Sequence, residues 1–269
     1  MKKIFVNLLC SFIPSKKVRH KIRNKYLLNN IIKDNTTVTS SAIKNHDYKF
    51  YGQFEPQVDK FIFERYFSDI NFSGICIECG AYDGVVDSCT KFFEDNCNWN
   101  CYNIEAVPYI FEKLKNNRPK SKNFNLALFN ENGEKGFNFP IHPTLGKDFG
   151  NGSLKHTETH KNELLKENCK FEKFMIRTET YKSFVLKNNI KFLDLFVLDV
   201  EGVELEVIDG MNGCEVLPTV ICVEYANVGL EKIRISLEKL GYVFDTISNV
   251  NAFFIKKDML SLLIFKNLK

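Results

Sequence analysis

The chain has 269 residues, 44% of them hydrophobic, which allows one large globular domain with a short extension but not two full domains. Its net charge of +4 is concentrated at the amino end. Residues 1–33 contain seven Lys and two Arg without an acid, which leaves 28 basic against 33 acidic side chains in the other 236 residues. Because this body is net acidic and lacks a basic stripe, nucleic acid is not expected as a partner.

The first fifty residues are expected to form a basic segment and a linker. An apolar run over residues 4–13 is too short to span a bilayer, and basic residues follow it where a signal peptide would have a cleavage site. The pattern fits a segment on an anionic membrane face or an acidic partner, and equally a solvated amphipathic helix packed on the body. Residues 27–50 are polar, so the folded domain is expected over residues 51–269.

The nine cysteines are an odd number without a repeated spacing, which favours free thiols in a reducing, cytoplasmic compartment. Cys76 and Cys79 form a C-x-x-C pair. On a strand, residues three apart point to opposite faces, so this pair is a poor set of metal ligands. A second C-x-x-C that would complete a zinc site is missing from the sequence.

Strand-like and helix-like segments alternate along the body, which is typical of a parallel sheet with crossover helices. A first helix is expected after Pro56, where apolar residues recur at helical spacing up to Ile70. The further expected elements are strands at 75–79, 101–104, 124–128, 192–200 and 220–225, helices at 88–97, 109–117, 204–211 and 230–240, and a terminal hairpin of 242–247 with 252–255.

The segment 138–170 loses this periodicity, after a hairpin expected around Asn132 and Gly133. A long irregular segment within a compact domain is more often functional than not, so an irregular cap insertion is expected here. The segment contains His142, His156 and His160 without the H-E-x-x-H pattern of zinc proteases. Solvated loop histidines are the simpler interpretation, and one of the three is a candidate general base.

The most informative segment is an apolar strand that ends in Glu78 and continues through Gly80 and Gly84 into a helix. Such a strand, glycine loop and helix form the ligand crevice of an open α/β sheet. A dinucleotide site needs G-x-G-x-x-G, whereas Glu78 and Asp83 would repel a pyrophosphate. Carboxylates favour a cation, and S-adenosylmethionine carries both an ammonium and a sulfonium group.

Glu105 ends the second expected strand, 21 residues after Gly84. An acid at this place can accept hydrogen bonds from both hydroxyls of a ribose. Taken alone, Glu105 could be a solvated loop residue and the glycine loop is weak evidence. Together they predict a nucleoside cofactor.

Acidic residues also end the next two strands of the expected sheet. Asp199 and Glu201 follow the apolar run from Phe196, and Glu224 ends the run from Val220. Ligands of open α/β sheets bind at the carboxyl ends of the strands, so these three acids are the candidate catalytic residues. A helix cap would explain one of the first two acids but hardly both. Asp199 and Glu224 could together hold a divalent metal, and the metal requirement stays open at this point.

Two motifs of the chain resemble the FkbM family of methyltransferases. The first is Glu78-Cys-Gly-Ala-Tyr-Asp-Gly84, followed by Asn103-Ile-Glu105, and the second is Asp199-Val-Glu-Gly-Val-Glu204, followed by Ile208-Asp-Gly210. The resemblance covers about residues 51–256. It implies a Rossmann-like class I methyltransferase fold, in which a mostly parallel seven-stranded sheet has helices on both faces and a C-terminal antiparallel hairpin.

The resemblance also implies roles for the residues at these motifs. Asp199 and Glu201 would border the methyl-transfer site, with Glu224 beside them. Ala106 stands where the family usually has Pro, and Cys79 replaces a commoner aliphatic or small residue, but neither departure removes a carboxylate. The residues expected to bind S-adenosylmethionine are Glu78, Gly80, Ala81, Tyr82, Asp83, Gly84, Glu105 and Ala106.

Family members commonly O-methylate sugars or other hydroxyl-bearing natural products. The basic leader is similar to those of bacterial surface-polysaccharide enzymes. The resemblance therefore implies methylation of a sugar hydroxyl in a capsule or lipopolysaccharide glycan. The cysteine usage favours a cytoplasmic protein, and the basic segment suits peripheral contact with the inner membrane face. A nicotinamide-dependent sugar oxidoreductase is disfavoured by the missing glycine fingerprint. A non-catalytic membrane-surface adaptor is disfavoured because it would not need several acids in one crevice.

Overall fold

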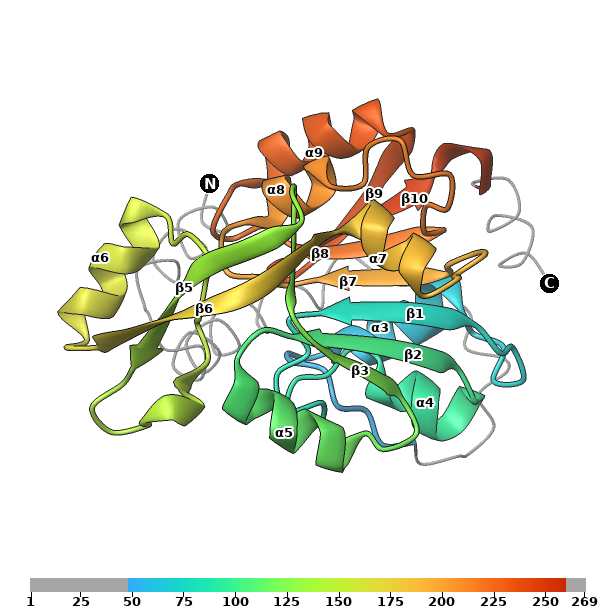
Figure 1. The fold of residues 1–269 in the computed structure, drawn as a ribbon. Coiled ribbons are helices and arrows are strands. Elements are labelled where there is room, and N and C mark those ends of the chain that lie inside the picture. The colour runs from blue at the N-terminus through green and yellow to red at the C-terminus, as the bar shows by residue number, and fades with distance from the viewer. Residues whose placement is uncertain (1–47, 260–269) are drawn as a thin grey trace, which may run out of the picture.

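The computed structural model describes residues 48–259, so the predictions for the basic segment and most of the linker lie outside the described residues. A seven-stranded sheet with the order β3-β2-β1-β7-β8-β10-β9 forms the centre of the domain (Figure 1). Strands β3 to β8 in this order are parallel, and the β9–β10 hairpin is antiparallel. The strands are β1 (Ile75–Cys79), β2 (Asn100–Glu105), β3 (Lys122–Asn125), β7 (Leu195–Leu198), β8 (Val220–Glu224), β9 (Tyr242–Ser248) and β10 (Asn251–Lys256).

Helices cover both faces of this sheet, which confirms the predicted Rossmann-like architecture. Strand β7 is apolar on both faces, as a strand between two layers of helices must be: Leu195 and Val197 pack in one core cluster, and Phe196 and Leu198 pack in the other. One cluster includes helices α3 (Val58–Tyr66) and α4 (Lys91–Cys97), and the other includes α7 (Tyr181–Lys187), α8 (Glu204–Asp209) and α9 (Leu230–Lys239). Helix α5 (Pro108–Asn117) lies beside β2 and β3, and a short 3-10 helix, η2 (Lys257–Met259), follows β10.

The C-x-x-C pair of β1 follows the same alternation. Cys76 belongs to the cluster of α3 and α4, whereas Cys79 belongs to the cluster of α7 to α9. The prediction that the two thiols point to opposite faces is therefore confirmed, and they cannot share a metal ion.

A second sheet has three strands in the order β4-β6-β5: β4 (Ala127–Phe129), β5 (Gly133–Ile141) and β6 (Lys170–Thr180). The single strand predicted over 124–128 is wrong, because the chain leaves the large sheet after Asn125 and enters the small one at Ala127. The hairpin predicted at Asn132–Gly133 is also wrong, since β4 and β5 both pair with β6 and not with each other.

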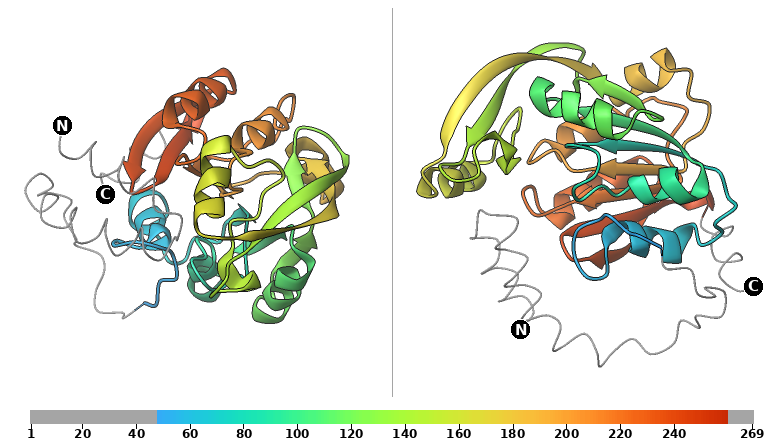
Figure 2. Two further views of the ribbon diagram at one scale, coloured as in Figure 1. Left: turned by 90° about the vertical axis from the view of Figure 1, so that its left-hand side faces the viewer. Right: turned by 90° about the horizontal axis from the view of Figure 1, so that it is seen from below.

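Residues 133–180 form an arm, which consists of β5, the 3-10 helix η1 (Lys147–Phe149), α6 (Glu158–Lys166) and β6. The arm curves away from the large sheet beyond the carboxyl ends of its parallel strands (Figures 1 and 2). Much of the predicted irregular cap 138–170 is therefore regular. Helix α6 starts where the Thr157 side chain accepts a hydrogen bond from the backbone N–H of His160, and β5 pairs with β6 along its whole length.

Among residues 48–259, the structure contains no helix that is long and apolar enough to cross a bilayer.

Candidate active site

Glu78 is buried and bonded to the segment that leads into α4. It shares a strand face with Cys76, which directs it toward α3 and α4. Its carboxylate accepts hydrogen bonds from the hydroxyls of Ser88 (2.9 Å) and Thr90 (2.6 Å) and from the backbone N–H of Cys89 (2.6 Å). Burial raises the pKa of Glu78, and Arg118 and these donors oppose the shift. Glu78 thus holds the segment between the glycine loop and α4, and its contact with the cofactor stays a prediction.

Gly80 brings β1 into close contact with the end of β7. It has φ +87°, and a Cβ atom at this position would lie 1.8 Å from the carbonyl oxygen of Asp199. A side chain is therefore excluded both by conformation and by space. The next residue, Ala81, is buried and donates its N–H to the carbonyl of Ile104 at the end of β2. The ends of three neighbouring strands are joined at this loop.

The rest of the glycine loop is held by its own short-range contacts. The carboxylate of Asp83 accepts hydrogen bonds from the backbone N–H groups of Val85 and Val86. Gly84 has φ +78°, and a Cβ atom there would lie 2.5 Å from the Leu114 side chain. The Asp83 carboxylate is thus engaged in the turn that leads out of the loop.

Glu105 lies where the sequence placed it, at the carboxyl end of β2 and 7% exposed. Its two carboxylate oxygens accept hydrogen bonds from the backbone N–H groups of Tyr82 (3.0 Å) and Val107 (2.8 Å). These bonds fix its orientation beside Gly80.

A cavity of about 60 Å³ lies at this edge of the sheet. Of the eight expected cofactor residues, Gly80, Glu105 and Ala106 line it, and Asp199 lies on the same wall. Three residues of the arm, which were not predicted from the sequence, also line the cavity: Phe137, Gly152 and Leu154. No local signal identifies them, because only the return of the arm across the sheet edge brings them there.

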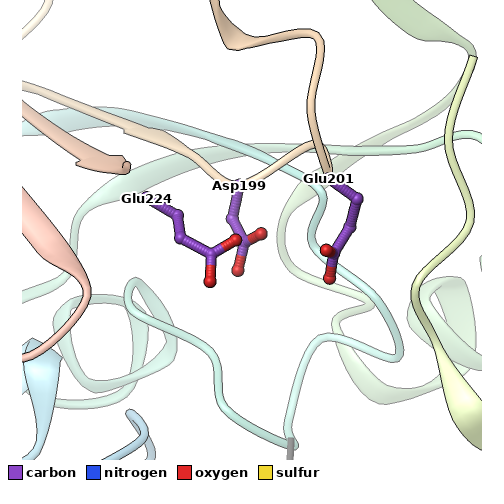
Figure 3. A group of neighbouring side chains, drawn as sticks. All are labelled: Asp199, Glu201 and Glu224. Atoms are coloured by element: carbon purple, nitrogen blue, oxygen red, sulfur yellow. The ribbon is translucent and has the colours of Figure 1, made fainter. Parts of the chain in front are cut away.

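Asp199, Glu201 and Glu224 come together as predicted from the ends of β7 and β8. Their carboxylates offer oxygen atoms that all lie within 4.8 Å of one another, and Figure 3 shows the three carboxyl groups pointing to the same side. Glu201 and Glu224 are each 5% exposed. Three carboxylates at this distance suit a proton, an ammonium group or a divalent cation.

Two residues from other elements border this acid cluster. The Asn227 side chain donates to Glu201 (3.0 Å), and Nδ1 of the buried His160 lies 3.9 Å from Oε2 of Glu201. His156 stacks edge-on against His160, and burial lowers its pKa. His142 instead lies 3.7 Å from Glu167 within the arm. Of the three candidate bases, His160 thus has the carboxylate of Glu201 beside it.

A family model described as "Methyltransferase FkbM domain" matches residues 78–244, which includes both acidic motifs and the arm. The chain belongs to the FkbM methyltransferase family. A second model, described as beta-1,4-N-acetylgalactosaminyltransferase (CgtA), matches residues 1–45, outside the described residues. A search of curated proteins found no match.

Among solved structures, this member of the FkbM family is similar to an FkbM methyltransferase from Methylobacillus flagellatus KT, with 10% identity and a TM-score of 0.43. The match covers 68% of this chain, which spans only 43% of that protein's length. A TehB-like SAM-dependent methyltransferase from Corynebacterium glutamicum has 9% identity, a TM-score of 0.36 and coverage of 69% and 81% of the two chains. A precorrin-6y C5,15-methyltransferase from Geobacter metallireducens has 11% identity, a TM-score of 0.38 and coverage of 73% and 86%.

Glu204 supports the loop that carries Asp199 and Glu201. It is fully buried, and its Oε1 accepts hydrogen bonds from the backbone N–H groups of Val200 (3.3 Å) and Gly202 (3.1 Å). Burial raises the pKa of Glu204 to about 8, and the neighbouring charges of Asp199 and Glu201 act in the same direction. The folded protein therefore keeps Glu204 protonated at neutral pH.

Glu204→Gln is expected to be tolerated and to remove one source of pH-dependent stability. Between the unfolded pKa near 4.5 and the folded pKa of about 8, the folded state binds a proton that the unfolded state has lost. The unfolding free energy of the wild type therefore falls as pH rises through this window, by roughly 1 kcal/mol per pH unit. Gln has no titratable proton, so the variant does not show this fall. Urea unfolding at pH 5, 7 and 8.5 should show the variant gaining on the wild type; a difference that does not change with pH would contradict the assignment.

Proposed function

We propose that this chain transfers the methyl group of S-adenosylmethionine to a hydroxyl group of a sugar or glycan. The observation that carries the proposal is the convergence of Gly80, Glu105 and Asp199 on one cavity at the carboxyl edge of the sheet. Crevices at this edge are the binding sites of open α/β folds. The membership in the FkbM family supports methyl transfer as the reaction.

The residues at this cavity fit the proposed cofactor. Glu105 lines the cavity at the carboxyl end of β2, where an acid can accept hydrogen bonds from ribose hydroxyls. The acid cluster of Asp199, Glu201 and Glu224 lies along the same edge and favours a positively charged group. S-adenosylmethionine supplies an activated methyl group with its own leaving group, so the protein contributes mainly orientation.

Asp199 is our candidate for the group that takes the proton of the acceptor hydroxyl. It lines the cofactor cavity and also belongs to the acid cluster, so it lies between the two proposed reactants. Proton removal during attack makes a hydroxyl a better nucleophile. Glu201 and Glu224 would orient the acceptor by accepting hydrogen bonds from its other hydroxyls, with Glu201 held by a hydrogen bond from Asn227 and with His160 beside it.

A divalent cation held by the acid cluster is the second candidate for hydroxyl activation. The structure brings a third carboxylate, Glu201, to the two that the sequence offered, all within 4.8 Å. Coordination to such an ion would lower the pKa of the acceptor hydroxyl. Chelation followed by addition of Mg²⁺ or Mn²⁺ separates the two candidates, because turnover that survives chelation leaves Asp199 as the base.

The glycan class of the acceptor is supported by the amino-terminal segment. The model that matches residues 1–45 is described for a sugar-transferring enzyme, and we propose that this chain modifies a glycan of bacterial surface polysaccharide. The basic residues of the same segment suit peripheral contact with the cytoplasmic face of an anionic membrane. Vesicle flotation with and without residues 1–47 would test this part of the proposal.

Cofactor titration is the experiment that tests the proposed function. Calorimetry should show micromolar binding of S-adenosylmethionine, and Glu105→Ala should weaken it at least about tenfold, because two hydrogen bonds to a charged acceptor are lost. The matched control is Glu112→Ala, which removes an exposed carboxylate paired with Lys115 on α5. Binding of NAD alone would favour a sugar oxidoreductase, and binding of neither would favour an adaptor.

A further inference from the structure

The arm forms one wall of the cofactor cavity and has to be considered part of that site. Phe137 comes from β5, and Gly152 and Leu154 from the segment before α6, whereas the opposite wall comes from the ends of β1, β2 and β7. The cavity between them measures about 60 Å³. In the described arrangement, the arm covers the cavity on the side opposite the strand ends.

One end of the arm is held to the glycine loop and α5 through Asp148 of η1. The Tyr82 hydroxyl donates to the backbone carbonyl of Asp148 (3.0 Å). The Asp148 carboxylate accepts hydrogen bonds from the Tyr109 hydroxyl and from Nζ of Lys113 (2.6 Å). The side chains of Lys113 and Asp148 are 42% and 58% exposed. Exposed pairs of this kind contribute little free energy, so these contacts hold the arm in place but can be broken at small cost.

The arm also contacts the loop after β7, on the opposite side of the crevice. The backbone of Lys155 lies close to Gly202, where a Cβ atom would be 3.4 Å from the Lys155 carbonyl oxygen. His160 of α6 lies 3.9 Å from Glu201 of the acid cluster. The arm therefore spans the crevice from the glycine loop to the loop that carries the acid cluster.

We propose that the arm is a lid that opens to admit S-adenosylmethionine and to release the product, and that Asp148 is its latch. The inference rests on the proposed function, because it assigns the cavity to that cofactor. Closure would bring Phe137 and Leu154 against the bound nucleoside and exclude water from the acid cluster. Opening breaks the contacts of Asp148 with Tyr82, Tyr109 and Lys113 and lets the cavity expand.

Pulse-chase binding of radiolabelled S-adenosylmethionine to the full chain tests the latch. Asp148→Ala should speed both uptake and release by about two- to fivefold, while the equilibrium Kd changes less than either rate. Faster uptake is the decisive sign, because loss of a mere binding contact would speed release alone. The matched control is Glu172→Ala, which removes an equally exposed ion pair with Lys147 inside the arm and should leave both rates unchanged.

The outcomes separate the lid from the proposed function. Unchanged rates in Asp148→Ala, or faster release without faster uptake, would overturn the lid. Absence of S-adenosylmethionine binding in the wild type would overturn the proposed function, and the lid with it. Hydrogen exchange of the wild type gives a second measurement, since saturating S-adenosylmethionine should slow exchange at residues 137–154; unaltered exchange there would contradict closure.

Discussion

Asp199→Asn is expected to reduce methyl transfer by at least about a hundredfold while the Kd for S-adenosylmethionine stays within about threefold of the wild type. The amide keeps the size and shape of the side chain beside the cavity but cannot take the proton of the acceptor. The loss should therefore appear in kcat and not in cofactor binding. Product formation from labelled cofactor, with a panel of sugar acceptors, provides the measurement.

The control for this variant is Asp209→Asn, which makes the same chemical change at an exposed residue of α8 that bonds to Asn212. It should retain full turnover. If Asp199→Asn also retained turnover with cofactor binding intact, Asp199 would have neither a base nor a metal-ligand role. If Asp199→Asn and Glu224→Gln lost activity together and chelation abolished turnover of the wild type, the acid cluster would act by holding a cation.

The parallel core and its acidic edge could be predicted because both depend on local sequence patterns. Strand β1 has the predicted bounds, and the acids at the ends of β7 and β8 meet because neighbouring parallel strands end at one edge. The C-terminal hairpin was equally local. In these elements the hydrophobic period, the turn residues and the tertiary partner all favour one structure.

The small sheet could not be predicted, because its strands are specified by distant partners. The apolar run 124–128 reads as one strand, yet Phe124 pairs with β2 and Ala127 with β6. Strand β6 mixes charged and apolar residues on both of its faces and has no continuous apolar face, so its pairing with β5 is a tertiary effect. The hydrogen-bond partners of Glu78 could not be predicted either, because its motif does not reveal that the hydroxyls of Ser88 and Thr90 donate to its carboxylate.

Arg118→Met is expected to cost about 3–5 kcal/mol of unfolding free energy, the largest stability effect among the described residues that we consider. Arg118 is fully buried and donates to the Glu94 carboxylate, to the Gly84 carbonyl (3.1 Å) and to Ser88 Oγ (3.2 Å). Its Nη1 also lies 4.0 Å from the Glu78 carboxylate. Removing the guanidinium would leave two buried carboxylates without their cation, and both belong to segments that hold the glycine loop.

Urea unfolding measures this loss, with Arg234→Met as the control, because Arg234 pairs with Glu238 on the exposed face of α9 and should show no measurable change. Adding Glu94→Met to Arg118→Met should recover part of the stability, since it removes one of the stranded charges. Equal stability of the two Arg variants would show that the buried network does not stabilise the fold. Because Arg118 also holds Gly84, an Arg118→Lys variant that folds should bind S-adenosylmethionine more weakly, which would connect the buried ion network to the cofactor loop it supports.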